Sequence, residues 1–147
     1  MDETLLEIRE YQGAGYQPLV DYGDWRVAIL RFLHELQPDR IESMERHSET
    51  DEVFVLLFGQ GVLIMGGCGA KVERIYPQVM EHGKIYNVKR NAWHTVLLSH
   101  DASVLLVENR DTGKHGNLST CIRVYLLIIR NCLFAFARFL GHRADVL

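Results

Sequence analysis

The sequence predicts an all-β protein built as an antiparallel barrel or sandwich. From about residue 16 to residue 108 it is divided into short apolar segments at fairly even spacing. Turn residues, mainly Gly, Asp and Pro, separate these segments, and no helical pattern lies between them. The 147 residues are enough for one domain with its own hydrophobic core and too few for two domains of common size.

A short helix at about residues 3–10 is expected to come first, before Gly13 and Gly15 change the character of the chain. Strands are then expected at residues 16–20, 25–33, 41–46, 52–58, 61–65, 72–76, 84–88, 94–98 and 103–108. Turns at residues 21–24, 37–39, 59–61, 66–69 and 99–101 divide them. Residues 1–116 are therefore assigned to a β-barrel domain.

Residues 117–147 form a tail of different character. From 120 to 140 the chain is strongly apolar and is interrupted by Arg123, Arg130 and Arg138. The uncharged stretches are far shorter than the roughly 20 residues that span a bilayer, so no membrane span is expected. The arginine spacing predicts a helix that covers the barrel or pairs with another subunit. A helix on a membrane surface and a tail without evolved structure remain alternatives.

The net charge, the N-terminal residues and the cysteines indicate which partners and which cellular compartment to expect. The net charge is -3, with 24% charged residues, so the basic excess typical of a nucleic-acid-binding surface is missing and no nucleic-acid partner is expected. The acidic start has no positive region followed by an apolar run, and the three cysteines form no CxxC pair. We expect a cytoplasmic protein with reduced thiols.

Polar residues that bind metals occur in two places that the expected hairpins bring together. Glu45 and His47 are two residues apart and point to the same face of a strand, and Glu52 begins the next strand. About forty residues later, His94 begins a strand that follows a turn. We expect all four side chains to point into one barrel interior.

The first of these segments runs from Asp39 through five residues to Glu45-x-His47, then through four residues to Glu52 and through six more to Gly59. This spacing resembles the first motif of the cupin superfamily, which is a glycine, five residues, a His-x-His pair, three or four residues, a glutamate, six residues and a glycine. Asp39 stands in the place of the first glycine, and Glu45 in the place of the first histidine.

The second segment runs from Gly83 through five residues to the hexapeptide 89–94, and then through three residues to Leu98. It is similar to the second cupin motif, Gly, five residues, Pro-x-Gly-x-x-His, three residues, Asn. The spacing agrees, whereas Lys89 and Asn91 replace the turn proline and glycine, and Leu98 replaces the asparagine. Trp93, beside the histidine, is expected either to line a pocket or to belong to the core.

The resemblance implies a cupin-like jelly-roll barrel that holds a metal through His47, Glu52 and His94. Two imidazoles and a carboxylate suit a divalent transition metal, Fe, Mn, Ni or Zn. Glu45 is either a further ligand or a free carboxylate. In the catalytic hypothesis the metal polarises the substrate, and Glu45 or Glu49 moves a proton.

Three classes of function follow. The first is a metal-dependent enzyme, an isomerase, epimerase, lyase or dioxygenase, that acts on a small polar metabolite such as a sugar, keto acid or ureide. The second is a non-catalytic module that binds a small molecule or a metal. The third is a structural barrel that assembles through its apolar tail. A homodimer is expected, because open sheet edges and apolar surface need cover.

Overall fold

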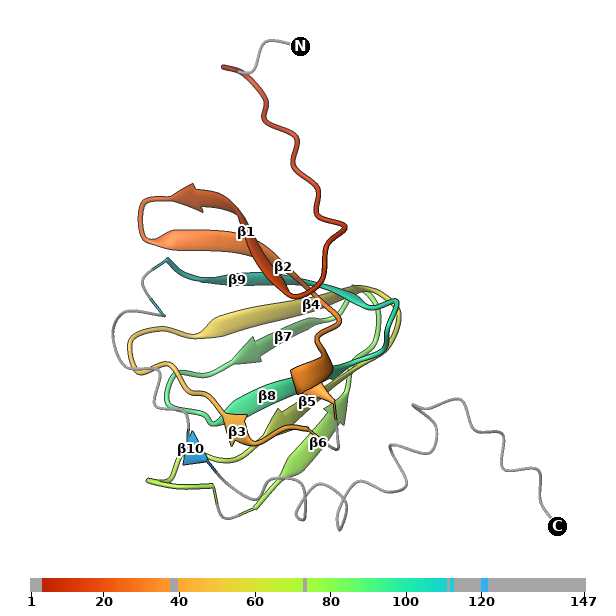
Figure 1. Ribbon diagram of the computed structural model, residues 1–147. Helices are drawn as coiled ribbons and strands as arrows, with labels where there is room; N and C mark the ends of the chain where they lie inside the picture. Colours follow the sequence, from red (N-terminus) through yellow and green to blue (C-terminus); the bar gives the residue numbers. More distant parts are fainter. Residues whose placement is uncertain (1–3, 38–39, 73, 111, 113–119, 122–147) are drawn as a thin grey trace, which may run out of the picture.

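The computed structural model describes residues 4–37, 40–72, 74–110, 112 and 120–121 (Figure 1). The strands are β1 (Tyr16–Tyr22), β2 (Trp25–Arg31), β3 (Ser43–Met44), β4 (Glu52–Phe58), β5 (Gly61–Met65), β6 (Tyr76–Val79), β7 (Ile85–Val88), β8 (His94–Leu98), β9 (Ser103–Asn109) and β10 (Thr120–Cys121). A single 3-10 turn, η1 (His34–Leu36), follows β2. Within these ranges no helix is long and apolar enough to cross a membrane.

All strand pairs are antiparallel, which confirms the predicted all-β barrel. The larger sheet has the order β1-β2-β9-β4-β7, a second sheet has the order β6-β5-β8, and β10 pairs with β3. Figure 1 shows the five-stranded sheet in the upper half of the barrel and the three-stranded sheet below it. The late strand β9 lies between β2 and β4, so segments far apart in the sequence form one surface.

In the five-stranded sheet, the core follows the alternation of the neighbouring strands β4 and β9. On β4 the side chains of Glu52, Phe54 and Leu56 are buried, and on β9 those of Val104, Leu106 and Glu108 are buried, while the residues between them are partly exposed.

The apolar members of this set form one core cluster with side chains of the facing sheet, including Leu63, Val96 and Leu98. A second cluster, around Trp93, Met44 and Ile64, fills the other face of the three-stranded sheet. Both faces of β5 are therefore buried.

The strands expected at residues 52–58, 61–65 and 94–98 have the predicted bounds. The turn after β4 depends on Gly59, whose φ of 72° is in the left-handed region. A Cβ there would lie 2.6 Å from the Ala102 Cα, so the turn admits no side chain. The strand expected at 72–76 is displaced to β6, where Pro77 pairs with Ile64; an edge strand tolerates proline because one side needs no donor.

The helix predicted at residues 3–10 is wrong for the residues that the structure describes. Residues 6–10 have no regular secondary structure, and only a turn occurs at 4–5. The side chains of Leu5 and Ile8 are 80% and 83% exposed and that of Leu6 is 46% exposed, so the apolar residues of the segment gain little burial in the described part of the chain. A helix this short is not stable in water without such packing.

The predicted C-terminal helix falls almost entirely outside the described residues. Its first two residues, Thr120 and Cys121, form β10 and pair with Met44 and Ser43. The chain after the barrel therefore returns to the sheet edge at β3 before residue 122, where the description ends. The expected division between residues 1–116 and 117–147 remains a prediction.

Candidate metal centre

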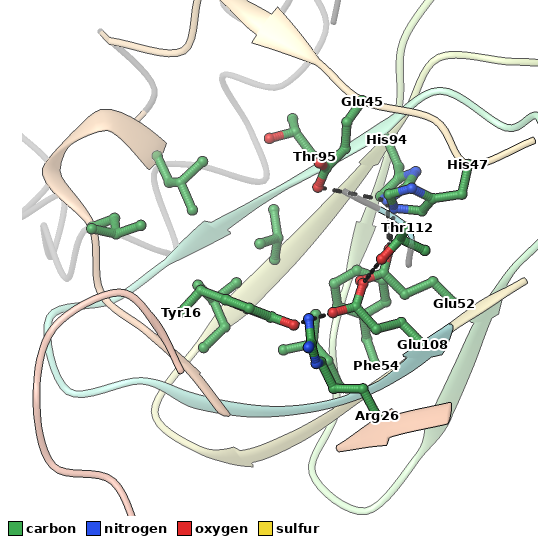
Figure 2. Close-up of a pocket in the computed structure, with 15 residues that line it drawn as sticks. Tyr16, Arg26, Glu45, His47, Glu52, Phe54, His94, Thr95, Glu108 and Thr112 are labelled. Carbon is green, nitrogen blue, oxygen red and sulfur yellow. Dashed lines mark hydrogen bonds and ion pairs between the residues drawn. The ribbon is translucent and has the colours of Figure 1, made fainter. Parts of the chain in front are cut away.

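Glu45, His47, Glu52 and His94 lie together in the barrel, with one nitrogen or oxygen atom of each within 4.8 Å of the others. Glu52 Oε2 is 2.9 Å from His47 Nε2 and also 2.9 Å from His94 Nε2. The two imidazole centroids are 5.2 Å apart. His47, Glu52 and His94 are buried, being 6%, 4% and 1% exposed. Figure 2 shows the four side chains converging at one end of a cavity.

Backbone pairing fixes these side chains. Glu52 and His94 open β4 and β8, and both point inward. Glu45 forms an isolated antiparallel bridge with His94, through backbone N···O contacts of 2.9 and 2.8 Å. His47 lies in the loop between β3 and β4, and its carbonyl accepts a hydrogen bond of 2.7 Å from the backbone N–H of Asn91. Backbone hydrogen bonds with Asn91 and His94 of the second motif thus fix the positions of Glu45 and His47 in the first.

Asn91 explains one departure from the family motif. Its φ of 65° is in the left-handed region, where the motif has glycine. Asparagine is among the non-glycine residues that adopt this conformation most readily. The tight turn before His94 is therefore kept, although its glycine is not.

The hydrogen bond at Nδ1 of His94 determines which of its two ring nitrogens carries the proton. Nδ1 lies 2.9 Å from the carbonyl oxygen of Ala92, which only accepts, so Nδ1 carries the proton. In the neutral ring Nε2 then presents a lone pair to the carboxylate of Glu52. Two acceptors at 2.9 Å need a cation between them, either a proton or a metal ion. A histidine whose second nitrogen donates to a carbonyl is the usual form of a metal ligand.

Burial and mutual attraction shift the pKa values of these groups in opposite directions. Burial alone would raise the pKa of Glu52, but hydrogen bonds from His47 and His94 outweigh it, and the pKa is lowered. Burial would lower the pKa of His94, but Glu52 outweighs it, and the pKa is raised. Burial raises the pKa of Glu45, so this carboxyl holds its proton to higher pH than a free glutamate.

The two candidate proton carriers differ in position. Glu45 is half-exposed as a whole, its Oε1 lies 4.0 Å from His94 Nε2, and it lines the cavity. Glu49 is exposed and accepts a hydrogen bond from the Ser48 hydroxyl. It is absent from the described residues that line the cavity. The structure brings Glu45 to the cluster and leaves Glu49 on the surface.

Trp93 belongs to the core. It is 1% exposed, packs in the cluster on the far face of the three-stranded sheet, and donates its indole N–H to the carbonyl of Gly69 at 2.9 Å. The guanidinium of Arg46 lies over the ring, 4.5 Å from its centroid. Trp93 therefore anchors the strand that begins at His94.

The cavity at the cluster has a volume of about 330 Å³, near the lower end of the range for small-molecule pockets. Apolar side chains form much of its wall, namely Leu30, Leu33, Leu36, Phe54, Val96 and Leu106. A second polar group also lines it: Tyr16, Arg26, Glu108 and Thr112. Figure 2 shows the carboxylate of Glu108 between the Tyr16 and Thr112 hydroxyls.

The sequence reasoning missed this second group, although a signal for it exists. Arg26, Ala28 and Leu30 alternate on one face of β2, and Val104, Leu106 and Glu108 alternate on one face of β9. A charged residue that continues a buried apolar row points into the interior. The sequence does not reveal that these two rows are neighbours, since β2 and β9 are far apart in the chain.

Asp51 ties the start of β4 to the turn before His94. Its carboxylate accepts hydrogen bonds from Lys89 Nζ at 2.7 Å, the Arg90 backbone N–H at 2.9 Å and Asn87 Nδ2 at 3.0 Å. These interactions, above all the hydrogen bond from Lys89, lower the pKa of Asp51 to about 2. Lys89, which replaces the turn proline of the motif, is thereby fixed outside the cavity lining.

We expect Asp51→Asn to lower the urea midpoint of unfolding at pH 6, and the difference from the wild type to shrink in acid. A lowered folded-state pKa stabilises the protein fully above the unfolded value of about 4, and this stabilisation is lost as the pH falls toward about 2. Circular dichroism in urea between pH 6 and pH 3 measures it. Asp24→Asn, at an exposed turn, controls for the loss of a charge. A difference that stays constant with pH would contradict the expectation.

No family model and no curated protein matches the sequence. Solved structures are similar to it: Bacillus halodurans BH2720 aligns at 13% identity over 77% of this chain and 82% of that chain, with a TM-score of 0.50. Fe(II) HppE aligns at 15% identity over 64% of this chain and 48% of that chain, with a TM-score of 0.51. An RmlC-like cupin family protein from Methanocaldococcus jannaschii aligns at 15% identity over 74% of this chain and 91% of that chain, with a TM-score of 0.48. At these identities the likeness shows the fold alone.

Proposed function

The chain has the cupin fold that the spacing of its two motifs predicted, and from this premise we propose that it is a metal-dependent enzyme acting on a small polar metabolite. One observation carries the proposal: the buried carboxylate of Glu52 lies 2.9 Å from both imidazole Nε2 atoms. His94 has its other nitrogen on a carbonyl, so the lone pair of its Nε2 faces that carboxylate. A divalent cation satisfies all three groups at once.

The residues present fit such an ion. His47, Glu52 and His94 would hold it, and Glu45 is close enough to join them. Ligand atoms bound to a transition metal at about 2.1 Å lie about 3 to 4 Å from one another. The pairs here are 2.9 Å, 2.9 Å and, for His94 to Glu45, 4.0 Å apart. Two imidazoles with one or two carboxylates suit Fe, Mn, Ni or Zn. Because the similar structure of HppE is that of its Fe(II) form, iron is the first metal to test.

The bound metal would supply Lewis-acid polarisation of a substrate carbonyl or hydroxyl. The protein's own contribution is to position the substrate and to move a proton. Glu45 is the group for the proton, because its carboxyl lines the cavity, its Oε1 is 4.0 Å from His94 Nε2, and burial raises its pKa. The apolar wall around Phe54 and Leu106 limits the water around the reacting group.

The test is turnover of a panel of small sugars, keto acids and ureides by protein loaded in turn with Fe, Mn, Ni and Zn. We expect at least one substrate to be isomerised, epimerised, cleaved or oxidised, and we expect a chelator to abolish the reaction. Turnover that survives the chelator would contradict the proposal. Tight ligand binding without turnover under every metal would favour the alternative, a non-catalytic small-molecule or metal-binding module.

Glu45→Gln separates catalysis from binding. We expect it to lower kcat by at least about a hundredfold, because general acid–base catalysis contributes about 10² to 10⁴-fold. Metal content should change little, because His47, Glu52 and His94 remain. Steady-state kinetics and elemental analysis of the same preparation measure the two effects. Glu49→Gln is the matched control, since that carboxylate is exposed on the surface, and a loss of activity there equal to that in Glu45→Gln would contradict the assignment.

A homodimer remains part of the proposal, in a cytoplasmic protein whose partners are small molecules. The outward face of the five-stranded sheet carries apolar side chains in register, where Val107 pairs with both Val27 and Val53 and Leu105 with both Ile29 and Val55. Neighbouring Leu57 is 49% exposed. Two copies that pack these faces together would cover them. Light scattering should give twice the monomer mass, and Leu105→Glu should halve it; a monomeric wild type would contradict the expectation.

A further inference from the structure

A row of charged side chains crosses the inner face of the five-stranded sheet. Arg26 on β2 pairs directly with Glu108 on β9. On the other side of β9, Val107 pairs with Val53 of the antiparallel strand β4. The next residue on β9, Glu108, therefore lies beside Glu52. Neighbouring strands are about 4.8 Å apart. The candidate metal ligand Glu52 and this second carboxylate therefore occupy adjacent positions, and both side chains line the same cavity.

Glu108 is held as an acceptor. It is 9% exposed, the Tyr16 hydroxyl donates to its Oε1, and the Thr112 hydroxyl donates to its Oε2 at 2.8 Å. Each carboxylate oxygen has two acceptor positions, so each retains one beyond these bonds. Burial, followed by the bond to Glu108, raises the pKa of Tyr16, so its hydroxyl stays a donor.

Arg26 also lines this end of the cavity and interacts with Tyr16, but its charge is paired with that of Asp21. Its Nε and Nη2 donate to the two carboxylate oxygens of Asp21 at 2.7 and 3.0 Å, a bidentate pair that balances its charge. The group of Asp21, Arg26 and Glu108 therefore keeps one net negative charge, on a buried carboxylate. A second anion placed there would meet like charge in a medium where solvent screens it poorly.

We propose that Glu108 and Tyr16 form a subsite that binds a hydroxyl or amino group of the ligand and excludes a second anionic group. The substrate class is then a small hydroxy or amino compound with at most one carboxylate, and not a dicarboxylate or a phosphate ester. The inference rests on the proposed function only in assigning the oxygen end of the ligand to the metal. The cavity of about 330 Å³ restricts the ligand to a small metabolite.

Calorimetric titration of zinc-loaded full-length protein with two matched series of acids tests the subsite. One series is butyrate, 4-hydroxybutyrate, 4-aminobutyrate and succinate, and the other has the same end groups with one more methylene. We expect the hydroxy or amino member to bind at least about tenfold more tightly than the parent acid, as a hydrogen bond to a charged group provides. The diacid should bind no more tightly than the parent.

Glu108→Gln should bring the diacid and the hydroxy member to within about threefold of each other and leave the zinc content unchanged. Glu81→Gln, the same change at an exposed glutamate, should leave the ranking as it is in the wild type. A wild type that prefers the diacid, that binds none of the acids, or whose ranking survives Glu108→Gln would overturn the inference. A wild type that binds none of Fe, Mn, Ni and Zn would instead overturn the proposed function, and the same series on metal-free protein would still decide the subsite.

Discussion

Removal of the metal is expected to lower the free energy of unfolding by about 4 kcal/mol, when the loaded protein is compared in a thousandfold excess of metal over its Kd. The proposed metal would bind only the folded chain, because Glu45 and His47 meet Glu52 and His94 only when β3, β4 and β8 are in place. Urea unfolding followed by circular dichroism, with metal and with a chelator, measures the difference.

Glu52→Gln should abolish most of this metal-dependent stabilisation, since the carboxylate that both imidazoles face is removed. Glu81→Gln is the matched control: its carboxylate is exposed and pairs with Lys84, so the metal dependence should persist. Equal unfolding midpoints for loaded and chelated wild type would contradict the account.

Trp93→Ala is expected to lower the free energy of unfolding by about 3 to 5 kcal/mol, the usual cost of truncating a large buried aromatic residue. The ring is 1% exposed, its N–H donates to Gly69, and Arg46 covers it. The variant leaves a cavity beside the start of β8 and removes one of the two hydrogen bonds that the Gly69 carbonyl accepts, the other coming from Arg46. Thermal and urea unfolding of the chelated protein measure the loss separately from metal binding.

Trp25→Ala is the control for Trp93→Ala. Trp25 is 44% exposed and contacts only the ring of Tyr22 among the aromatic pairs of the described residues. Its removal should cost less than about 1 kcal/mol, as is usual for surface positions. Equal losses at the two tryptophans would show that Trp93 does not anchor the second cluster.

The elements that the sequence predicts well are apolar segments with clear turn signals at their ends. Glu52–Phe58 and His94–Leu98 have their predicted bounds because each is a continuous apolar run that begins at a polar residue and ends at a turn. The sequence pattern also indicated Glu45, His47, Glu52 and His94, the four side chains that the structure places together. The N-terminal helix was wrong because its apolar residues stay largely exposed and gain too little burial to stabilise so short a helix.

Local sequence patterns do not reveal the order of the strands within a sheet. Arg26 and Glu108 are 82 positions apart, and only the placement of β9 between β2 and β4 makes them neighbours. The same limit applies to Asp51, whose three donors lie on β7 and in the turn between β7 and β8. Pairing between distant segments depends on the whole fold, so the second polar group of the cavity could be found only in the structure.

Elemental analysis of protein purified without added metal tests the central claim most directly, when the wild type is compared with His47→Ala/His94→Ala. We expect about one equivalent of Fe, Mn, Ni or Zn per wild-type chain and almost none in the double variant, because two of the three proposed ligands are lost. His34→Ala/His82→Ala, which removes two exposed imidazoles, should keep the wild-type content. Equal metal in the wild type and the His47→Ala/His94→Ala variant, or no metal in the wild type even after loading, would contradict a metal centre at Glu52.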